Sequence, residues 1–202
     1  MPIIEAAPAI LALVALGGYL LGSVPFGLVM ARLFGLGDIR QIGSGNIGAT
    51  NVLRTGNKLA AFLTLILDAG KGGIAVLVAR ALVGEDATQL AGFAAFLGHC
   101  FPVFLGFQGG KGVATFLGTL LALFWPAGVA ACLTWAAMAG VFRISSLAAL
   151  IAAISAPIWV SVLGMPQASL VSVLLAVLIF IRHRANITRL LAGQEPRIGK
   201  KS

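Results

Sequence analysis

Long apolar runs recur along the whole of this sequence, and they constrain its fold more than any other feature. Of the 202 residues, 59% are hydrophobic and only 10% are charged, and the mean hydropathy is +1.04. Water-soluble domains of ordinary composition do not combine these values. A helix of about 20 apolar residues can cross the hydrocarbon layer of a bilayer. The composition therefore predicts an all-α, polytopic membrane protein that forms a single domain over residues 1–202.

Seven segments approach the length of a membrane crossing. They cover residues 8–32, 58–83, 88–106, 112–125, 126–142, 146–164 and 167–182. The fourth is short and Trp125-Pro126 separates it from the fifth, so a re-entrant hairpin remains an alternative there. Pro25 predicts a kink in the first segment, because proline removes a helical hydrogen bond. This segment lacks a preceding basic region and an obvious cleavage site, which favours a retained helix over a signal peptide.

The basic residues predict the orientation of these segments. Twelve of the fourteen fall on one side of a seven-crossing arrangement, namely Arg32, Arg40, Arg54, Lys58, Lys111, Arg143, Arg182, Arg184, Arg189, Arg197, Lys200 and Lys201. Cytoplasmic loops of membrane proteins are enriched in Lys and Arg, so the N-terminus should lie outside and the C-terminus in the cytoplasm. Topology thus accounts for the net charge of +8. No basic stripe with interleaved aromatic residues suggests nucleic-acid binding.

A polar stretch from Gly43 to Arg54, here called the first glycine loop, interrupts the apolar pattern. Its candidate binding residues are Ser44, Gly45, Asn46, Gly48, Ala49, Thr50, Asn51 and Arg54. Glycines let the backbone aim several N–H groups at an anion, and a guanidinium can hold an oxyanion with two parallel hydrogen bonds. The glycine spacing matches a dinucleotide fingerprint, but the buried strand and βαβ unit of that fold are missing. The loop predicts a phosphate site, with a purely structural turn as the alternative.

A second glycine-rich stretch, Gly106 to Thr115, is here called the second glycine loop. It contains Gly109, Gly110, Lys111 and Gly112. It is not a Walker A loop, because Leu105 stands where the first glycine is required and Gly112 replaces the magnesium-binding Ser or Thr. An interfacial lysine is often only a topology anchor. The flanking glycines, which are costly to order, favour a binding role for Lys111 instead.

Ionisable side chains also occur inside predicted membrane segments. Asp68 and Lys71 lie three residues apart on one helical face and can neutralise each other. They predict either a buried pair that fixes helix packing or a wall of the polar site to which the glycine loops belong. His99 lies near a helix end, and a structural histidine is favoured over a catalytic one. Because no Cys, His or carboxylate lies at metal-ligand spacing from it, no metal site is predicted.

The last cluster begins after the final apolar segment, at Arg182. His183 and Asn186 share a helical face there, and Glu195 follows. A basic tail that touches anionic lipid explains the arginines, since each base near such a surface gains about 1 kcal/mol. It does not explain the imidazole, the carboxamide and the acid. With both glycine loops, the cluster offers amides, hydroxyls, cations and an imidazole at one membrane face, which predicts one or two bound phosphates.

These residues resemble those of the bacterial acyl-phosphate-dependent glycerol-3-phosphate acyltransferases over nearly the full chain. The resemblance rests on Gly22-Ser23-x-Pro25-Phe26-Gly27, the first glycine loop, Leu67-Asp68-x-x-Lys71-Gly72, Gly98-His99-x-Phe101-Pro102-Val103, Gly109-Gly110-Lys111-Gly112-Val113-Ala114-Thr115 and Arg182-His183-Arg184-x-Asn186-Ile187-x-Arg189-Leu190. It implies a seven-helix enzyme of the bacterial inner membrane with its active site on the cytoplasmic side. The implied reaction moves a fatty acyl group from acyl phosphate to the 1-hydroxyl of glycerol 3-phosphate and gives lysophosphatidic acid and phosphate.

The resemblance also implies roles for individual residues. Ser44, Arg54, Lys111, His183 and Asn186 would be catalytic, and Gly45, Asn46, Gly48, Ala49, Thr50, Asn51, Gly109, Gly110, Gly112 and Glu195 would bind substrate phosphates. Either His183 or a substrate phosphate would accept the hydroxyl proton. The partners would be the two substrates and membrane lipid, with no cofactor, no metal and a functional monomer.

Two other classes remain as alternatives to an enzyme. A transporter for a phosphorylated solute would also use broken helices and glycine-rich loops. It should place functional groups at the bilayer midplane and beyond, whereas only Asp68, Lys71 and His99 meet that condition. A noncatalytic lipid-binding protein would explain the anion sites but not the number of distinct polar clusters.

Overall fold

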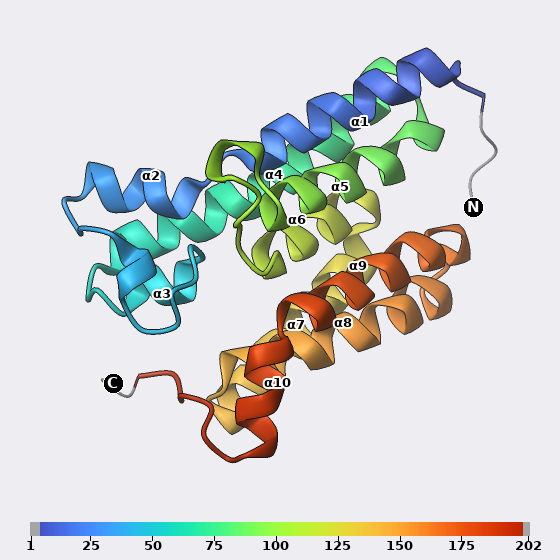
Figure 1. Ribbon diagram of the computed structural model, residues 1–202. Coiled ribbons are helices and arrows are strands. Elements are labelled where there is room, and N and C mark those ends of the chain that lie inside the picture. The colour runs from blue at the N-terminus through green and yellow to red at the C-terminus, as the bar shows by residue number, and fades with distance from the viewer. Residues whose placement is uncertain (1–4, 200–202) are drawn as a thin grey trace. The chain divides into compact units, whose positions relative to one another are not determined.

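The computed structural model describes residues 5–199 as helices joined by loops (Figure 1). The helices are α1 (Pro8–Ser23), α2 (Phe26–Leu33), α3 (Ala49–Leu53), α4 (Lys58–Leu82), α5 (Glu85–Cys100), α6 (Val113–Leu123), α7 (Trp125–Phe142), α8 (Ser145–Val162), α9 (Ser169–Arg182) and α10 (Arg184–Leu191), with short 3₁₀ turns at Ile39–Gln41, Val103–Leu105 and Pro166–Ala168. No strand occurs among the described residues, so the predicted all-α class is confirmed.

The structure supports a protein that crosses the membrane several times. Within residues 5–199, five stretches are long and apolar enough to span a bilayer: Pro8–Leu33, Lys58–Leu82, Glu85–Leu105, Trp125–Phe142 and Ser145–Val162. Pro166–Arg182 and Arg184–Leu191 meet at 64° and form a sixth if the bent pair is one span. The remaining predicted crossing corresponds to α6, whose 11 residues extend only about 16 Å against a hydrocarbon core of about 30 Å. The count of seven and the orientation stay predictions.

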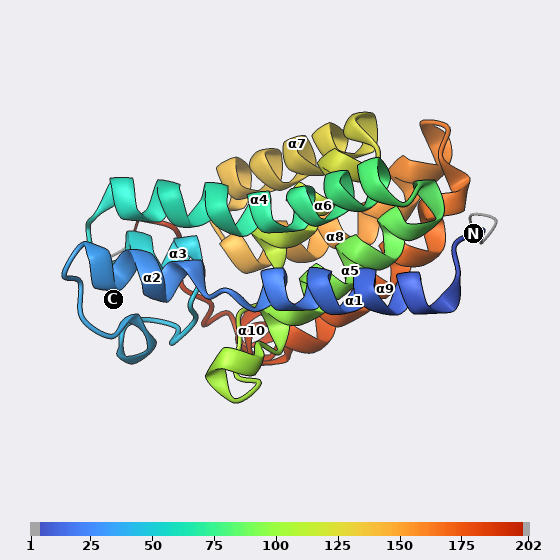
Figure 2. The ribbon, with the colours of Figure 1, turned by 90° about the horizontal axis from the view of Figure 1, so that it is seen from above.

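The first apolar stretch is broken where the sequence predicts a kink. Helix α1 ends at Ser23 and α2 begins at Phe26, directly after Pro25. Figure 2 shows α4 running beside both α1 and α2. The break therefore lies against the middle of a longer helix, which supplies contacts to the interrupted backbone.

The chain forms two compact units, one that ends at Leu123 and one that begins at Phe124. In the first unit, α1 packs closely on α5 because glycines remove the side chains between them. A Cβ atom at Gly22 would overlap the backbone carbonyl of Ala95, and one at Gly98 would overlap the carbonyl of Tyr19. Small residues allow such close backbone approach in membrane helices. The single-domain prediction is not tested by this division and stays a prediction.

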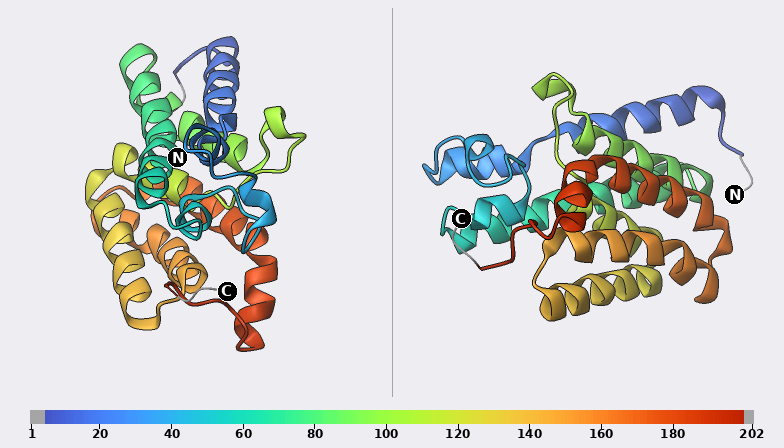
Figure 3. Two further views of the ribbon diagram at one scale, coloured as in Figure 1. Left: turned by 90° about the vertical axis from the view of Figure 1, so that its left-hand side faces the viewer. Right: turned by 60° about the horizontal axis from the view of Figure 1, so that its bottom comes forward.

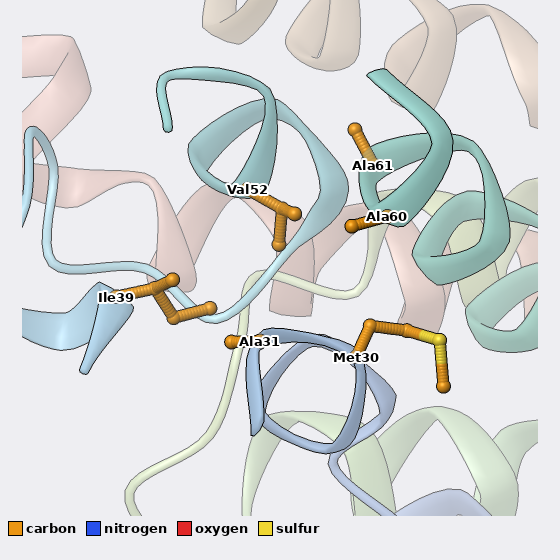
Figure 4. Close-up of a cluster of buried hydrophobic side chains, with 6 residues drawn as sticks. All are labelled: Met30, Ala31, Ile39, Val52, Ala60 and Ala61. Carbon is orange, nitrogen blue, oxygen red and sulfur yellow. The ribbon is translucent and has the colours of Figure 1, made fainter. Parts of the chain in front are cut away.

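A small apolar cluster anchors the first glycine loop at both ends (Figure 4). Its members are Met30, Ala31, Ile39, Val52, Ala60 and Ala61, all of them buried. They come from α2, the turn at Ile39–Gln41, α3 and the first turns of α4. Burial of these groups joins the segments before and after the loop, so the loop spans a fixed gap.

The second unit is built on α8, which packs against both α7 and α9 (Figure 3). Alanines make up much of its buried face, including Ala148, Ala152 and Ala156. The indole N–H of Trp159 donates to the hydroxyl of Thr134 on α7 at 3.2 Å. Small side chains and interhelical hydrogen bonds are the ordinary means of helix association in membranes.

Candidate functional site

The first glycine loop is organised around the side chain of Asn51. This residue is 1% exposed, and its amide nitrogen donates to the carbonyl of Ile39 at 2.7 Å. Its carbonyl oxygen accepts from the backbone N–H of Ser44 at 3.2 Å and from the guanidinium of Arg54 at 3.3 Å. Both polar atoms of Asn51 are therefore used inside the protein. This geometry favours a role in holding the loop over the direct phosphate contact expected from the sequence.

The side chain of Arg54 lies against the turn at Gly43. Gly43 has a φ of +54°, and a Cβ atom there would lie 2.6 Å from Nη1 and 2.7 Å from Cδ of Arg54. Glycine is thus required for the backbone conformation and for the close approach of the guanidinium. Ser44, Thr50 and Arg54 are exposed. The loop consequently presents a hydroxyl-bearing, cationic surface.

The charge of Arg54 is not neutralised by a carboxylate within residues 5–199. By contrast, the guanidinium of the nearby Arg40 forms an ion pair with Asp38 at 2.7 Å. Hydrogen bonds from the Arg40 side chain and backbone lower the pKa of Asp38 to about 2. Because Arg54 is held by a neutral amide instead, its positive charge remains available to an anionic ligand.

The second glycine loop rests on helix α5. The N–H of Gly110 donates to the carbonyl of His99 at 3.0 Å, and a Cβ at Gly110 would overlap the imidazole ring of His99. Gly112 has a φ of +81°, and a Cβ there would overlap the ring of Phe96. Lys111 is thus held between two glycines, each pressed against a side chain of α5. Larger residues at either position would lift the loop away from the helix.

The predicted pair of Asp68 and Lys71 is present and buried. The Lys71 Nζ lies 2.8 Å from Oδ1 of Asp68, and the His99 Nδ1 lies 3.5 Å from the same oxygen. Exposed fractions are 2% for Asp68, 2% for Lys71 and 4% for His99. Burial favours the interpretation of a buried pair over that of a wall of the polar site. His99, which is also buried, contacts the same carboxylate oxygen and so belongs with the pair.

In the second unit, His183 lies where α9 ends and α10 begins. The ring is buried, and its Nδ1 lies 2.8 Å from the carbonyl oxygen of Ile179. A carbonyl can only accept, so Nδ1 carries the proton and donates. In a neutral ring the lone pair is then on Nε2. The hydrogen bond fixes both the tautomer and the orientation of the imidazole.

Glu195 organises the polar groups of the C-terminal cluster, which comprises His183, Asn186, Arg189 and Glu195. Its Oε1 accepts from the Asn186 amide at 2.5 Å and from the Ser146 hydroxyl at 2.7 Å, and its Oε2 accepts from the Arg189 guanidinium at 2.7 Å. Burial raises the pKa of Glu195, but these three hydrogen bonds outweigh it and lower the pKa below its usual range. The carboxylate is ionised at neutral pH and would repel a phosphate. It holds Asn186 in place, a role different from the predicted phosphate contact.

The sequence predicted no role for Ser146 or for Thr115. Ser146 donates to Glu195 across 49 residues, and the Thr115 hydroxyl donates to the backbone carbonyl of Asp68 at 2.8 Å. Hydroxyl residues in apolar segments commonly bond within their own helix. Nothing in the local sequence distinguishes these two, because their partners lie on distant segments.

Together, the helices and loops define a class of protein. The first unit presents a cationic glycine loop, and the second presents a buried imidazole of fixed tautomer. With the apolar spans, they define the class as a polytopic helical membrane protein. The profile of the family described as glycerol-3-phosphate acyltransferase matches residues 12–193. The chain belongs to this family.

Curated relatives match the full length of the chain. A protein named glycerol-3-phosphate acyltransferase from Jannaschia sp. (strain CCS1) is 71% identical over 202 residues, which is 100% of both chains. One of the same name from Cereibacter sphaeroides (strain ATCC 17025) is 65% identical and covers 100% of this chain and 96% of its own.

Solved structures share the fold. A crystal structure of PlsY (YgiH), an integral membrane glycerol 3-phosphate acyltransferase in its glycerol 3-phosphate form, has a TM-score of 0.88 and 42% identity, and the match covers 94% of this chain and 96% of that chain. The lysophosphatidic acid form gives 0.85 and 40%, with coverage of 94% and 95%. This protein is accordingly a membrane acyltransferase of phospholipid biosynthesis.

Proposed function

We propose that this protein transfers a fatty acyl group from acyl phosphate to the 1-hydroxyl of glycerol 3-phosphate, giving lysophosphatidic acid and inorganic phosphate. The observation that carries the proposal is the exposed guanidinium of Arg54, held by the neutral Asn51 above the Gly43 turn. Such a group binds a phosphate with two parallel hydrogen bonds. Family membership supports glycerol 3-phosphate as the acceptor.

The reaction needs little covalent participation by the protein. The hydroxyl oxygen of glycerol 3-phosphate attacks the acyl carbonyl carbon, and the bond from that carbon to the phosphate oxygen breaks. Phosphate leaves with the bonding electrons, and the hydroxyl proton passes to a base. A mixed anhydride already has a good leaving group, so the protein must mainly position the reactants and stabilise developing negative charge.

The polar residues divide these tasks. Ser44, Arg54 and Lys111 bind phosphate groups and stabilise the charge that develops on them. Asn186 donates a hydrogen bond to substrate, and Glu195 orients the Asn186 side chain. His183 is suited to act as the base because its Nδ1–H donates to Ile179, which leaves the lone pair on Nε2. A substrate phosphate is the other candidate for the base.

Acyl phosphate is preferred as the donor because the chain lacks the His-x-x-x-x-Asp motif of the other glycerol-3-phosphate acyltransferase class. At that spacing, Phe104 follows His99 and Thr188 follows His183. The test compares donors. Purified protein in lipid nanodiscs is incubated with glycerol 3-phosphate and either palmitoyl phosphate or palmitoyl-CoA. Equal amounts of lysophosphatidic acid and phosphate should form from palmitoyl phosphate alone. Product from palmitoyl-CoA, or none from either donor, would refute this donor assignment.

The proposal includes seven crossings of a bacterial inner membrane, with the basic loops in the cytoplasm. The distribution of Lys and Arg supports this orientation. Glu5→Cys and Thr188→Cys, each made after Cys100 and Cys132 are replaced by alanine, test it. A membrane-impermeant maleimide should label the first variant on spheroplasts and the second only after lysis. Labelling of both on intact spheroplasts would contradict the orientation.

The transporter alternative is tested with the same protein. Proteoliposomes are assayed for uptake of radiolabelled glycerol 3-phosphate with no acyl donor present. We expect no accumulation above that of empty vesicles. Protein-dependent uptake without turnover would favour transport.

A further inference from the structure

The proposed chemistry leaves three buried ionisable side chains without a role. Asp68 and Lys71 come from α4 and His99 comes from α5, and all three lie in the first unit. Burial of charges is costly, and replacement of a buried ion pair by apolar groups is often neutral or stabilising. Stability alone is therefore a weak explanation for this cluster. Its contacts lead instead to the two glycine loops.

Lys71 connects the cluster to the first glycine loop. Its ammonium donates to the carbonyl of Val24 at 2.9 Å, in the break between α1 and α2, and lies 5.7 Å from the centre of the Phe26 ring. A carbonyl freed at a helix break inside a membrane needs such a partner. Lys71 therefore fixes the point at which α2 begins.

Helix α2 in turn supports the first glycine loop. A Cβ atom at Gly27, one residue after Phe26, would overlap the backbone carbonyl of Ile47. The loop backbone thus lies directly on α2, within one helical turn of the carbonyl that Lys71 binds. Any shift of the break moves the surface on which the loop rests.

His99 connects the same cluster to the second glycine loop. Its Nδ1 faces Asp68 at 3.5 Å, and its ring fills the space beside Gly110. Its backbone carbonyl accepts from the N–H of Gly110. The hydroxyl of Thr115, the last residue of the loop, donates to the carbonyl of Asp68. The segment that carries Lys111 is therefore attached to α5 on one side and to α4 on the other.

We propose that Asp68, Lys71 and His99 form a buried positioning cluster that holds both glycine loops in the arrangement needed for acyl transfer. The three residues touch no substrate; they act through Val24 and Gly110. Asp68 is the shared element, because its carboxylate faces both Lys71 and His99. The proposal rests on the proposed function in one respect, namely that a displaced loop is expected to slow acyl transfer.

The decisive variant is the double substitution Asp68→Asn with Lys71→Met. It removes both charges at nearly constant volume, so no lone buried charge remains and the fold should persist. The Val24 carbonyl loses its partner and His99 loses its anionic neighbour. A misplacement of about 1 Å can cost about 100-fold in rate, so kcat/KM should fall about 100-fold.

Thr64→Val is the matched control. Thr64 is buried on the same helix, and within residues 5–199 its hydroxyl donates to the Ala60 carbonyl of that helix alone, at 2.8 Å. Valine keeps the methyl group that lies beside Gly27. Loss of this hydrogen bond should leave kcat/KM within about twofold, because no loop contact changes.

Hydrogen exchange provides a readout that does not depend on activity. In the double variant, backbone amides of residues 43–54 and 106–112 should exchange at least about tenfold faster, while the centres of α4 and α5 keep their protection. Faster exchange throughout α4 and α5, or loops as protected as in the wild type, would overturn the proposal. Wild-type turnover with palmitoyl phosphate separately decides the proposed function, so the two can fail independently.

His99→Phe provides a second variant if the double variant does not fold. Phenylalanine retains a ring beside Gly110 but loses the polar contact with Asp68. Amides of the second glycine loop should exchange faster, those of the first should not, and kcat/KM should fall about tenfold. Unchanged kinetics and exchange would show that the cluster serves helix packing alone.

Discussion

The first glycine loop and the C-terminal cluster contain similar residue types but centre them on different acceptors. In the loop, the oxygen that accepts from Arg54 belongs to the neutral Asn51. In the C-terminal cluster, the oxygens that accept from Arg189 and Asn186 belong to the anionic Glu195. A neutral acceptor orients a cation and leaves its charge available, whereas a carboxylate neutralises it. The first arrangement suits anion binding, and the second suits the fixing of neighbouring side chains.

The largest loss of activity is expected for substitution of His183, the proposed base in the C-terminal cluster. His183→Ala removes the imidazole that is buried and oriented by the Ile179 carbonyl. General-base catalysis contributes 10²- to 10⁴-fold, so kcat should fall about 1,000-fold. Steady-state kinetics with palmitoyl phosphate measure the change. If the variant raised only the Michaelis constant, His183 would be a binding group and a substrate phosphate would be the base.

Asn51→Asp gives the first glycine loop an anionic acceptor, like that of the C-terminal cluster. A carboxylate at this position would neutralise Arg54, repel phosphate and lose the donor to Ile39. We expect kcat/KM to fall at least about 100-fold. Charge-assisted binding of phosphate is lost, and a carboxylate oxygen faces the Ile39 carbonyl with no proton between the two acceptors.

Asn57→Asp is the matched control for that substitution. The Asn57 side chain caps the N-terminus of α4 by accepting from Ala60 at 2.9 Å, and aspartate caps equally well. Kinetics of both variants should be measured in the same lipid. Similar activity in the two variants would show that the neutral acceptor in the loop is unimportant.

Arg54→Lys tests the loop more gently. Lysine keeps the positive charge but loses the planar pair of donors, so it cannot make the bidentate contact. A drop of about tenfold in kcat/KM is expected, equivalent to about 1.4 kcal/mol. Full activity would rule out two parallel hydrogen bonds to phosphate.

Much of this fold could be predicted, because the length of an apolar run and the position of a proline determine local helix bounds. The predicted segment 58–83 lies within one residue of α4 (Lys58–Leu82), and the break at Pro25 occurs as expected. The division at Trp125-Pro126 also occurs as expected, since α6 ends at Leu123 and α7 begins at Trp125. Local composition does not show whether a helix as short as α6 spans the bilayer.

The candidate site residues and their roles stay predictions, but the structure shows contacts of theirs that the sequence did not predict. Asn51 and Glu195 both carry groups that bind phosphate or its donors, and the sequence assigned both to substrate. Among their hydrogen-bonding partners, Ile39 and Ser146 lie 12 and 49 residues away. Such contacts depend on tertiary structure, which residue types and spacing do not specify.

Glu195→Gln performs the converse conversion, giving the C-terminal cluster a neutral acceptor. Hydrogen bonds from Ser146, Asn186 and Arg189 lose the assistance of the negative charge. Hydrogen bonds to charged groups contribute about 1.5–3 kcal/mol, so the free energy of unfolding should fall by about 1–2 kcal/mol at pH 7. Kinetics should change by only a few fold, because Asn186 keeps a hydrogen-bonding partner.

The pH dependence gives this last prediction its sign. The pKa of Glu195 is lowered in the folded protein, so the unfolded state binds the proton more tightly and stability falls with acidity. The contribution is complete above the ordinary glutamate pKa of about 4.3 and is lost as the pH falls through the lower folded value. Thermal unfolding, followed by calorimetry, should therefore separate wild type from Glu195→Gln at pH 7 and bring them together near pH 3. A constant difference across that range would mean that the carboxylate acts through its shape, and the contrast with the first glycine loop would then not be one of charge.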